Sequence, residues 1–228
     1  MSLTTDQINK LLGIKESYQA SAKLLKILFD KKKREELFRA FLELETDMTS
    51  DWFHVYFEEE HANKLKYAQD FTPDSISKLL AALTGNDTGI RLDVASGTGS
   101  LTIQRWHADR CTMTPFEYQP SMFYYQCEEL SDRALPFLLF NLMIRGMNAT
   151  VIHGDSLSRE VKQAYFIQND NDDFMNFSSL NVMPHSKQTE EYLDIRKWLD
   201  EPINHIESPL SVLSRLGLKR EPEQIALF

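Results

Sequence analysis

The part of the sequence best suited to chemistry is a short run with an acid and two glycines, at residues 91–103. It begins as a buried strand, passes through Asp93 and Ala95 to Gly97 and Gly99, and ends as the start of a helix. Glycine adopts backbone conformations, and permits a close approach of a ligand, that a Cβ atom would block. A helix that starts directly after such a loop points its free N–H groups into the crevice where α/β proteins bind cofactors. Two glycines alone are weak evidence, but their setting predicts a cofactor-binding loop.

Two acids and a threonine-proline pair stand where a nucleoside cofactor would need them. Glu117 ends a predicted strand at 112–117, where an acid can accept hydrogen bonds from both ribose hydroxyls. Asp155 follows a predicted strand at 149–153, and its carboxylate can accept a hydrogen bond from an exocyclic adenine amine. Phe71-Thr72-Pro73 lies at the start of a helix that leads into the first strand. Taken singly, the first acid can be an ordinary surface residue, and the second acid and the threonine can be helix caps. Their order and spacing favour the functional interpretation.

Alternating strands and helices must position these residues. Strands are expected at 90–95, 112–117, 149–153 and 164–167, with helices at 99–108, 121–146 and 187–200. This alternation predicts an α/β fold with a parallel sheet and crossover helices. Apolar residues at helical spacing predict helices before the first strand. We therefore expect three parts: a helical N-terminal region at 1–66, an α/β domain at 67–200 and a C-terminal tail at 201–228.

Composition limits the class of protein. The chain has 228 residues, a net charge of −9 and 42% hydrophobic residues, which suits a globular protein and not an unaided nucleic-acid binder. The basic run Lys31–Arg34 could contact nucleic acid, but a solvated helix face explains it better. The two cysteines have no metal-ligand spacing, and no signal-peptide pattern or apolar run of membrane length is present. These features predict a cytoplasmic protein without a metal site or a membrane span.

Several linked segments resemble the amino-methylating DNA methyltransferases, most closely the modification subunits of type I restriction systems. Ala68-Gln-Asp-Phe-Thr-Pro73 is similar to their Gly-x-Phe-Thr-Pro segment, and Leu92–Leu101 is similar to their first cofactor motif. Phe116-Glu117-Tyr-Gln-Pro120 resembles their acidic strand end. Residues 138–157 resemble the passage that ends in Gly-Asp-Ser-Leu.

The resemblance implies a Rossmann-like sheet of the S-adenosylmethionine-dependent methyltransferases, with a helical domain before it. The cofactor-binding residues that it implies are Phe71, Thr72, Pro73, Asp93, Ala95, Gly97, Gly99, Glu117 and Asp155. DNA is the implied substrate, bound alone or with the help of a specificity or restriction subunit. Too few residues follow the third strand for the family's remaining strands, so either the sheet is abbreviated or a partner completes it.

The family's amine-binding motif, Asn/Asp-Pro-Pro-Tyr/Phe, is missing. The family uses it to hold the N6 amine of an adenine that has left the DNA stack. No two prolines are adjacent in this chain. Asn169, Asp170 and Phe174 stand at the expected place and are the candidate substitutes, although a solvated turn explains them better. Two functions therefore stay open: an adenine-N6 methyltransferase of the restriction-modification type, or a catalytically degenerate binding protein that acts through DNA, a partner subunit or the sliding clamp.

The C-terminal residues Gln224, Ile225, Leu227 and Phe228 resemble the pentapeptide by which bacterial replication and repair proteins dock on the sliding clamp. The glutamine would meet a polar edge of the clamp while the apolar side chains fill a pocket. A tail that folds back on its own core is the alternative.

Overall fold

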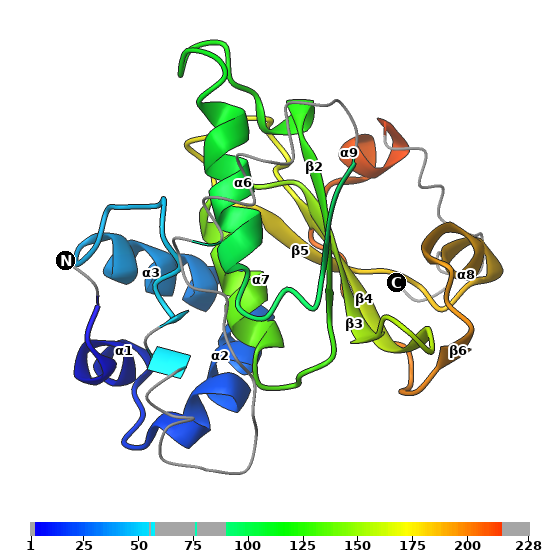
Figure 1. Cartoon of the computed structure of the whole chain (residues 1–228), viewed down its shortest axis with the longest axis horizontal. Helices are drawn as coiled ribbons and strands as arrows, with labels where there is room; N and C mark the ends of the chain where they lie inside the picture. Colours follow the sequence, from blue (N-terminus) through cyan, green and yellow to red (C-terminus); the bar gives the residue numbers. More distant parts are fainter. Residues whose placement is uncertain (1–2, 55, 58–75, 77–89, 216–228) are drawn as a thin grey trace.

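The computed structural model describes residues 3–54, 56–57, 76 and 90–215 (Figure 1). Within that part of the chain, no helix is both long enough and apolar enough to span a membrane. The predicted cofactor segment at 71–73 and the clamp-like residues at 224–228 lie outside the described residues.

The described residues before the sheet form three α-helices, as the apolar spacing predicted: α1 (Thr5–Leu12), α2 (Ala20–Leu28) and α3 (Lys31–Leu42), with a 3₁₀ turn η1 (Ser17–Gln19). Asp30 begins α3 by accepting a hydrogen bond from the Lys33 N–H at 3.2 Å. Phe38 and Phe41 each pack against Phe140 of a later helix, with ring centroids 4.8 Å apart in both pairs. The N-terminal helices therefore share one hydrophobic core with the sheet.

A six-stranded sheet forms the centre of the molecule: β1 (Ile90–Val94), β2 (Tyr124–Glu129), β3 (Ala149–Asp155), β4 (Glu160–Gln168), β5 (Ser179–Val182) and β6 (Lys197–Trp198). The strand order is β1-β2-β3-β4-β5, and β6 pairs with β4. β1, β2 and β3 are parallel and are joined by α6 (Ser100–Arg110) and α7 (Leu135–Ile144), which confirms the predicted crossovers. β4 is antiparallel to β3, because the short connection at 156–159 leaves no room for a crossover helix.

Two predicted elements are wrong and a third is shortened. Residues 112–117 form no strand, and the second strand is β2, inside the segment predicted as one helix at 121–146. The aromatic pair Tyr124 and Tyr125 favours a strand, and neither glycine nor proline separates β2 from the start of α7. The helix predicted at 187–200 is shorter, because α8 (Lys187–Leu193) ends at Asp194, whose φ is 51°.

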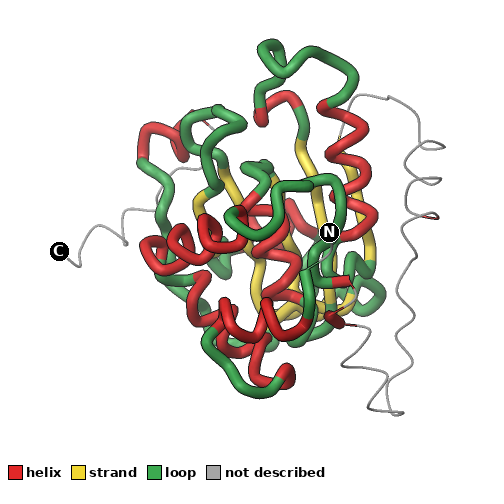
Figure 2. Tube along the Cα trace, turned by 90° about the vertical axis from the view of Figure 1, so that its left-hand side faces the viewer, coloured by secondary structure: helices red, strands yellow, loops and turns green. Residues whose placement is uncertain are grey.

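Helices cover both faces of the sheet. Figure 1 shows α6, α7 and the N-terminal helices on one side and α8 on the other, and Figure 2 looks onto the first side, with helices in front of strands. The first side holds the larger core, in which every residue of α7 is buried. The second side holds a smaller core around Ile152, Val161 and Phe166. Two short elements complete the described chain: η2 (Pro120–Met122) and α9 (Leu210–Arg215).

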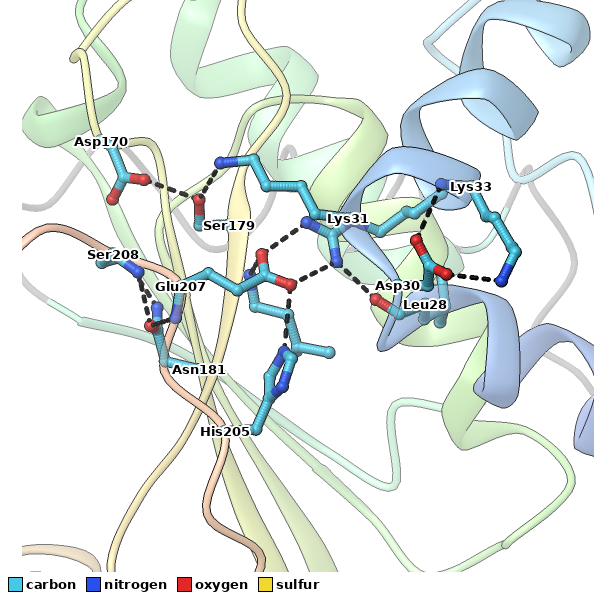
Figure 3. A network of polar contacts seen from close by, with 12 residues as sticks. Leu28, Asp30, Lys31, Lys33, Asp170, Ser179, Asn181, His205, Glu207 and Ser208 are labelled. Carbon is cyan, nitrogen blue, oxygen red and sulfur yellow. Dashed lines mark hydrogen bonds and ion pairs between the residues drawn. The ribbon is translucent and has the colours of Figure 1, made fainter. Parts of the chain in front are cut away.

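A buried ion pair fastens α3 to residues near the end of the described chain (Figure 3). Arg34 and Glu207 form two hydrogen bonds, 2.6 and 2.8 Å long, and their side chains are 1% and 8% exposed. Arg34 also donates to the Leu28 carbonyl, and His205 lies 3.0 Å from the Glu207 carboxylate. The N-terminal helices are thus held by this polar contact as well as by the core.

Candidate functional site

The glycine loop joins β1 to α6 in the conformation that the sequence predicted. Gly97 and Gly99 have φ values of 58° and 96°, in the left-handed region that favours glycine. A Cβ atom at Gly99 would lie 2.9 Å from Leu138 Cδ1, so the Leu138 side chain on α7 would have to shift to admit it. Ala95 also has a positive φ, 64°, although it carries a Cβ atom, and it is exposed at the end of β1. Backbone strain of this kind concentrates at functional sites.

Two acids flank this loop, the half-buried Asp93 at the carboxyl end of β1 and the buried Glu129 at the carboxyl end of β2. Asp93 Oδ2 accepts a hydrogen bond from Thr102 Oγ1 at 2.6 Å, and burial raises the pKa of Asp93. Glu129 accepts the Gly97 N–H at 2.6 Å with one oxygen and the Ser131 N–H at 2.7 Å with the other. Burial raises the pKa of Glu129 in spite of these hydrogen bonds, and the nearby Asp93 charge raises it further. Acids with a raised pKa beside a glycine loop are typical of a functional site.

Glu117 does not lie at this edge of the sheet. α6 runs back from the glycine loop, so the residues that follow it, 111–118, lie at the opposite edge, where β2 begins. There the Glu117 carboxylate is exposed and accepts hydrogen bonds from the Thr114 N–H at 3.0 Å and the Thr114 hydroxyl at 2.8 Å, which lower its pKa. The acid at the end of the second strand is Glu129, and the strand predicted at 112–117 pointed to Glu117 instead.

Asp155 ends β3 at the same edge as the glycine loop. β3 extends past the end of β2, where Glu129 pairs with His153. One oxygen of Asp155 accepts the Leu157 N–H at 2.8 Å in the turn to β4, which lowers the pKa of Asp155. The residue therefore caps a turn between strands and not a helix. His153, which the sequence analysis did not single out, is buried beside Glu129, and burial lowers its pKa.

The three candidate amine-binding residues lie at the opposite edge. β4 is antiparallel to β3, so the residues after β4 are far from the glycine loop. Asn169 is buried, and its side-chain amide donates to three backbone carbonyls at 2.8 to 3.2 Å. Asp170 accepts a hydrogen bond from the Ser179 hydroxyl at 2.6 Å, and the Phe174 ring lies 6.4 Å from the Tyr118 ring. The structure does not bring these residues to the glycine loop.

A cavity of about 510 Å³ lies at the C-terminal end of α6, and its walls include Met48, His107, Arg110, Tyr118 and Phe174. The eleven residues of α6 span about 16 Å, so this cavity and the glycine loop are separate places. The positive φ values at Ala95, Gly97 and Gly99, and the hydrogen bond from Gly97 to an acid at a strand end, make the loop the better candidate. Among the residues described, no group of three or more histidine, cysteine or acidic side chains could hold a metal ion.

One protein family matches most of the sheet. The sequence model of the family described as N-6 DNA methylase matches residues 45–190, more than half of the chain. The matched range contains the glycine loop, both flanking acids and the strands from β1 to β5. A search of curated proteins finds no significant match. The chain therefore belongs to the N-6 DNA methylase family.

Proposed function

We propose that the protein binds S-adenosylmethionine at the carboxyl ends of β1 and β2, and takes part in adenine-N6 methylation of DNA in a restriction-modification system. Its family generally uses this methyl donor. The observation that carries the proposal is the 2.6 Å hydrogen bond from the Gly97 N–H to Glu129, because it joins a glycine loop to an acid at a strand end. A nucleoside cofactor needs both groups in one crevice.

The polar groups at this edge suit a nucleoside cofactor that carries no phosphate. Glu129 and Asp155 offer carboxylate oxygens for ribose hydroxyls and an adenine amine, at the ends of neighbouring strands. A dinucleotide would place its phosphates at the start of α6. There, the hydroxyls of Thr98 and Ser100 already donate to the buried Asp51 carboxylate. Because that carboxylate would repel a phosphate, the site favours S-adenosylmethionine.

Methyl transfer also needs a pocket for an adenine that has left the DNA stack. S-adenosylmethionine supplies the electrophilic methyl group when bound, but the protein must hold the amine. Asn169 already donates its amide to the loop around it, at the edge opposite Gly97. We therefore propose that a partner subunit completes the amine-binding pocket. The same observation favours a second candidate function, a binding protein of this family that transfers no methyl group.

Isothermal titration calorimetry with S-adenosylmethionine tests the proposed site. We expect the wild-type protein to bind, and Glu129→Gln to bind at least roughly tenfold more weakly, because a charged hydrogen-bond acceptor is lost. Glu117→Gln is the matched control, since it changes an exposed acid at the opposite edge. Equal affinity of all three proteins would refute the role of Glu129. No binding by the wild-type protein at millimolar ligand would refute the cofactor site.

Transfer of tritiated methyl groups to unmethylated genomic DNA separates the two candidate functions. Incorporation by this chain alone would show that its own residues complete the pocket. Incorporation that appears only with added specificity and restriction subunits would support completion by a partner. Cofactor binding without incorporation in either mixture would support the binding protein.

We also propose that the C-terminal residues from Gln224 to Phe228 dock on the sliding clamp. The proposal rests on the sequence alone. A fluorescent peptide of residues 219–228 should bind purified clamp in a polarisation assay, and should lose that binding when Leu227 and Phe228 become alanine. Failure of the intact peptide to bind would end the proposal.

A further inference from the structure

Asp51 links the N-terminal region to the glycine loop. The residue is 8% exposed, and one carboxylate oxygen accepts hydrogen bonds from the hydroxyls of Thr98 and Ser100, the latter at 2.9 Å. The other oxygen accepts from Asn141 Nδ2 at 2.8 Å and from the Phe53 N–H at 2.9 Å. Donors from the loop, α6, α7 and the N-terminal segment thus converge on one carboxylate.

Further polar contacts hold the residues just before Asp51 against the same two helices. Arg145, the residue that directly follows α7, donates to the Ser50 carbonyl at 2.6 Å. Gln104 on α6 donates to the Thr49 carbonyl at 2.8 Å. The position of the Asp51 carboxylate is therefore fixed by backbone contacts as well as by its own hydrogen bonds.

The charge of Asp51 suits this place. A buried carboxylate costs free energy unless hydrogen bonds compensate for lost water, and four donors do so here. The carboxylate also lies at the N-terminal end of α6, where the helix dipole stabilises a negative charge. An asparagine could keep its oxygen toward Asn141, but its NH₂ group would then face Thr98 and Ser100. Both charged hydrogen bonds to the loop and the helix start would be lost.

We infer that Asp51 is a positioning residue that sets the conformation of the loop at 97–100. Residues 49–53 of the N-terminal region then help to shape the proposed cofactor site. That the ligand is S-adenosylmethionine rests on the proposed function. The effect of Asp51 on the loop without ligand does not depend on that proposal. A ligand that needs the ordered loop binds more weakly when the Asp51 charge is lost. By linkage, the same ligand strengthens the docking of the N-terminal segment.

Asp51→Asn tests this role in the full-length chain, with Asp47→Asn as the matched control. Asp47 is an acid on the same segment, but its carboxylate bonds within its own turn, to Thr49. Hydrogen exchange of the amides at 96–101 without ligand should become about tenfold faster or more in Asp51→Asn. The dissociation constant for S-adenosylmethionine should rise about 5- to 150-fold, the usual range for coupled sites. The control should match the wild-type protein in both measurements.

Each result decides for or against the role. Unchanged exchange at 96–101 in Asp51→Asn would overturn it, and weaker binding with unchanged exchange would make Asp51 a ligand contact instead. Faster exchange in a protein whose wild type binds no S-adenosylmethionine would support the positioning role and refute the proposed cofactor. If Asp51→Asn does not fold, Thr98→Val and Thr98→Ser replace it. Only the valine variant loses the hydroxyl, so equal loop exchange in these two variants would also overturn the role.

Discussion

Glu207→Gln tests how strongly the ion pair of Figure 3 holds the N-terminal helices. The substitution keeps the size of the side chain but removes the charge opposite Arg34. In the described part of the chain, Arg34 forms an ion pair with Glu207 alone, and it is 1% exposed. A buried cation left without its counter-ion costs about 3–5 kcal/mol of folding stability. We therefore expect a large loss of folding stability when this one buried ion pair is broken.

The titration of Glu207 gives a second measure of the same contact. Burial raises its pKa, but hydrogen bonds from His205 and Arg34 outweigh burial and lower the pKa to about 2, from an ordinary value of 4.5. This difference corresponds to about 3 kcal/mol of stability at neutral pH. Because the pKa is lower in the folded protein, the contribution is complete above pH 4.5 and is lost as the pH falls toward 2. Both measures therefore agree on the size of the effect.

Urea unfolding, followed by circular dichroism, measures this loss. At pH 7 we expect Glu207→Gln to lower the free energy of unfolding by about 3 kcal/mol, and at pH 3 by less than about half of that. Glu35→Gln is the matched control, because Glu35 is half-buried and its partner Arg39 is exposed, so this pair should contribute less than about 1 kcal/mol. Equal stability of Glu207→Gln and wild type at pH 7, or a loss that does not change with pH, would refute the reasoning.

Three further substitutions, the first with Gly13→Ala as its matched control, test the two edges of the sheet. Gly99→Ala should cost about 1–3 kcal/mol, because its φ is 96° and the new Cβ would lie 2.9 Å from Leu138. Gly13 has a φ of 65° and open space where a Cβ would lie, so Gly13→Ala should cost about 1 kcal/mol. Equal losses of Tm in the two alanine variants would contradict the close packing of Gly99 against Leu138. Asp93→Asn should raise the Tm at pH 7 and weaken S-adenosylmethionine binding. The Tm should rise because the pKa of Asp93 is raised in the folded protein, so its charged form destabilises the fold at a pH above that pKa. A lower Tm would contradict this reasoning. Asn169→Ala should lower the Tm, because hydrogen bonds to backbone carbonyls are lost, and should leave the calorimetric affinity for S-adenosylmethionine unchanged. A large loss of that affinity would show that Asn169 belongs to the binding site.

The glycine loop could be predicted because its signal is local. An acid, two glycines and a helix start follow one another directly, and the structure places them as predicted. Glu129 could not be found in the same way, because β2 runs into α7 without a glycine or proline between them. β2 has only six residues, which mix aromatic, polar and acidic side chains, so periodicity alone does not distinguish a strand from a helix there. The signal that was available is the pair Tyr124 and Tyr125, which favours a strand before the acid.

Contacts between distant residues account for the rest. The direction of β4 depends on the length of the turn after β3, and the strand starts at Glu160, earlier than its predicted start at residue 164. Because β4 runs antiparallel to β3, Asn169, which follows it, lies at the edge opposite the loop. Asp51 meets its partners Thr98 and Asn141 across 47 and 90 residues of sequence, and no local pattern contains that information.

Hydrogen exchange of the wild-type protein with and without S-adenosylmethionine tests the proposed location of the cofactor most directly, because it reports where on the chain the ligand binds. We predict slower exchange at residues 93–101 and 129–131 when the ligand is present, and no change at 111–118 or 169–174. Protection confined to 111–118 or 169–174, or no protection in any segment at saturating ligand, would contradict a cofactor site at the glycine loop.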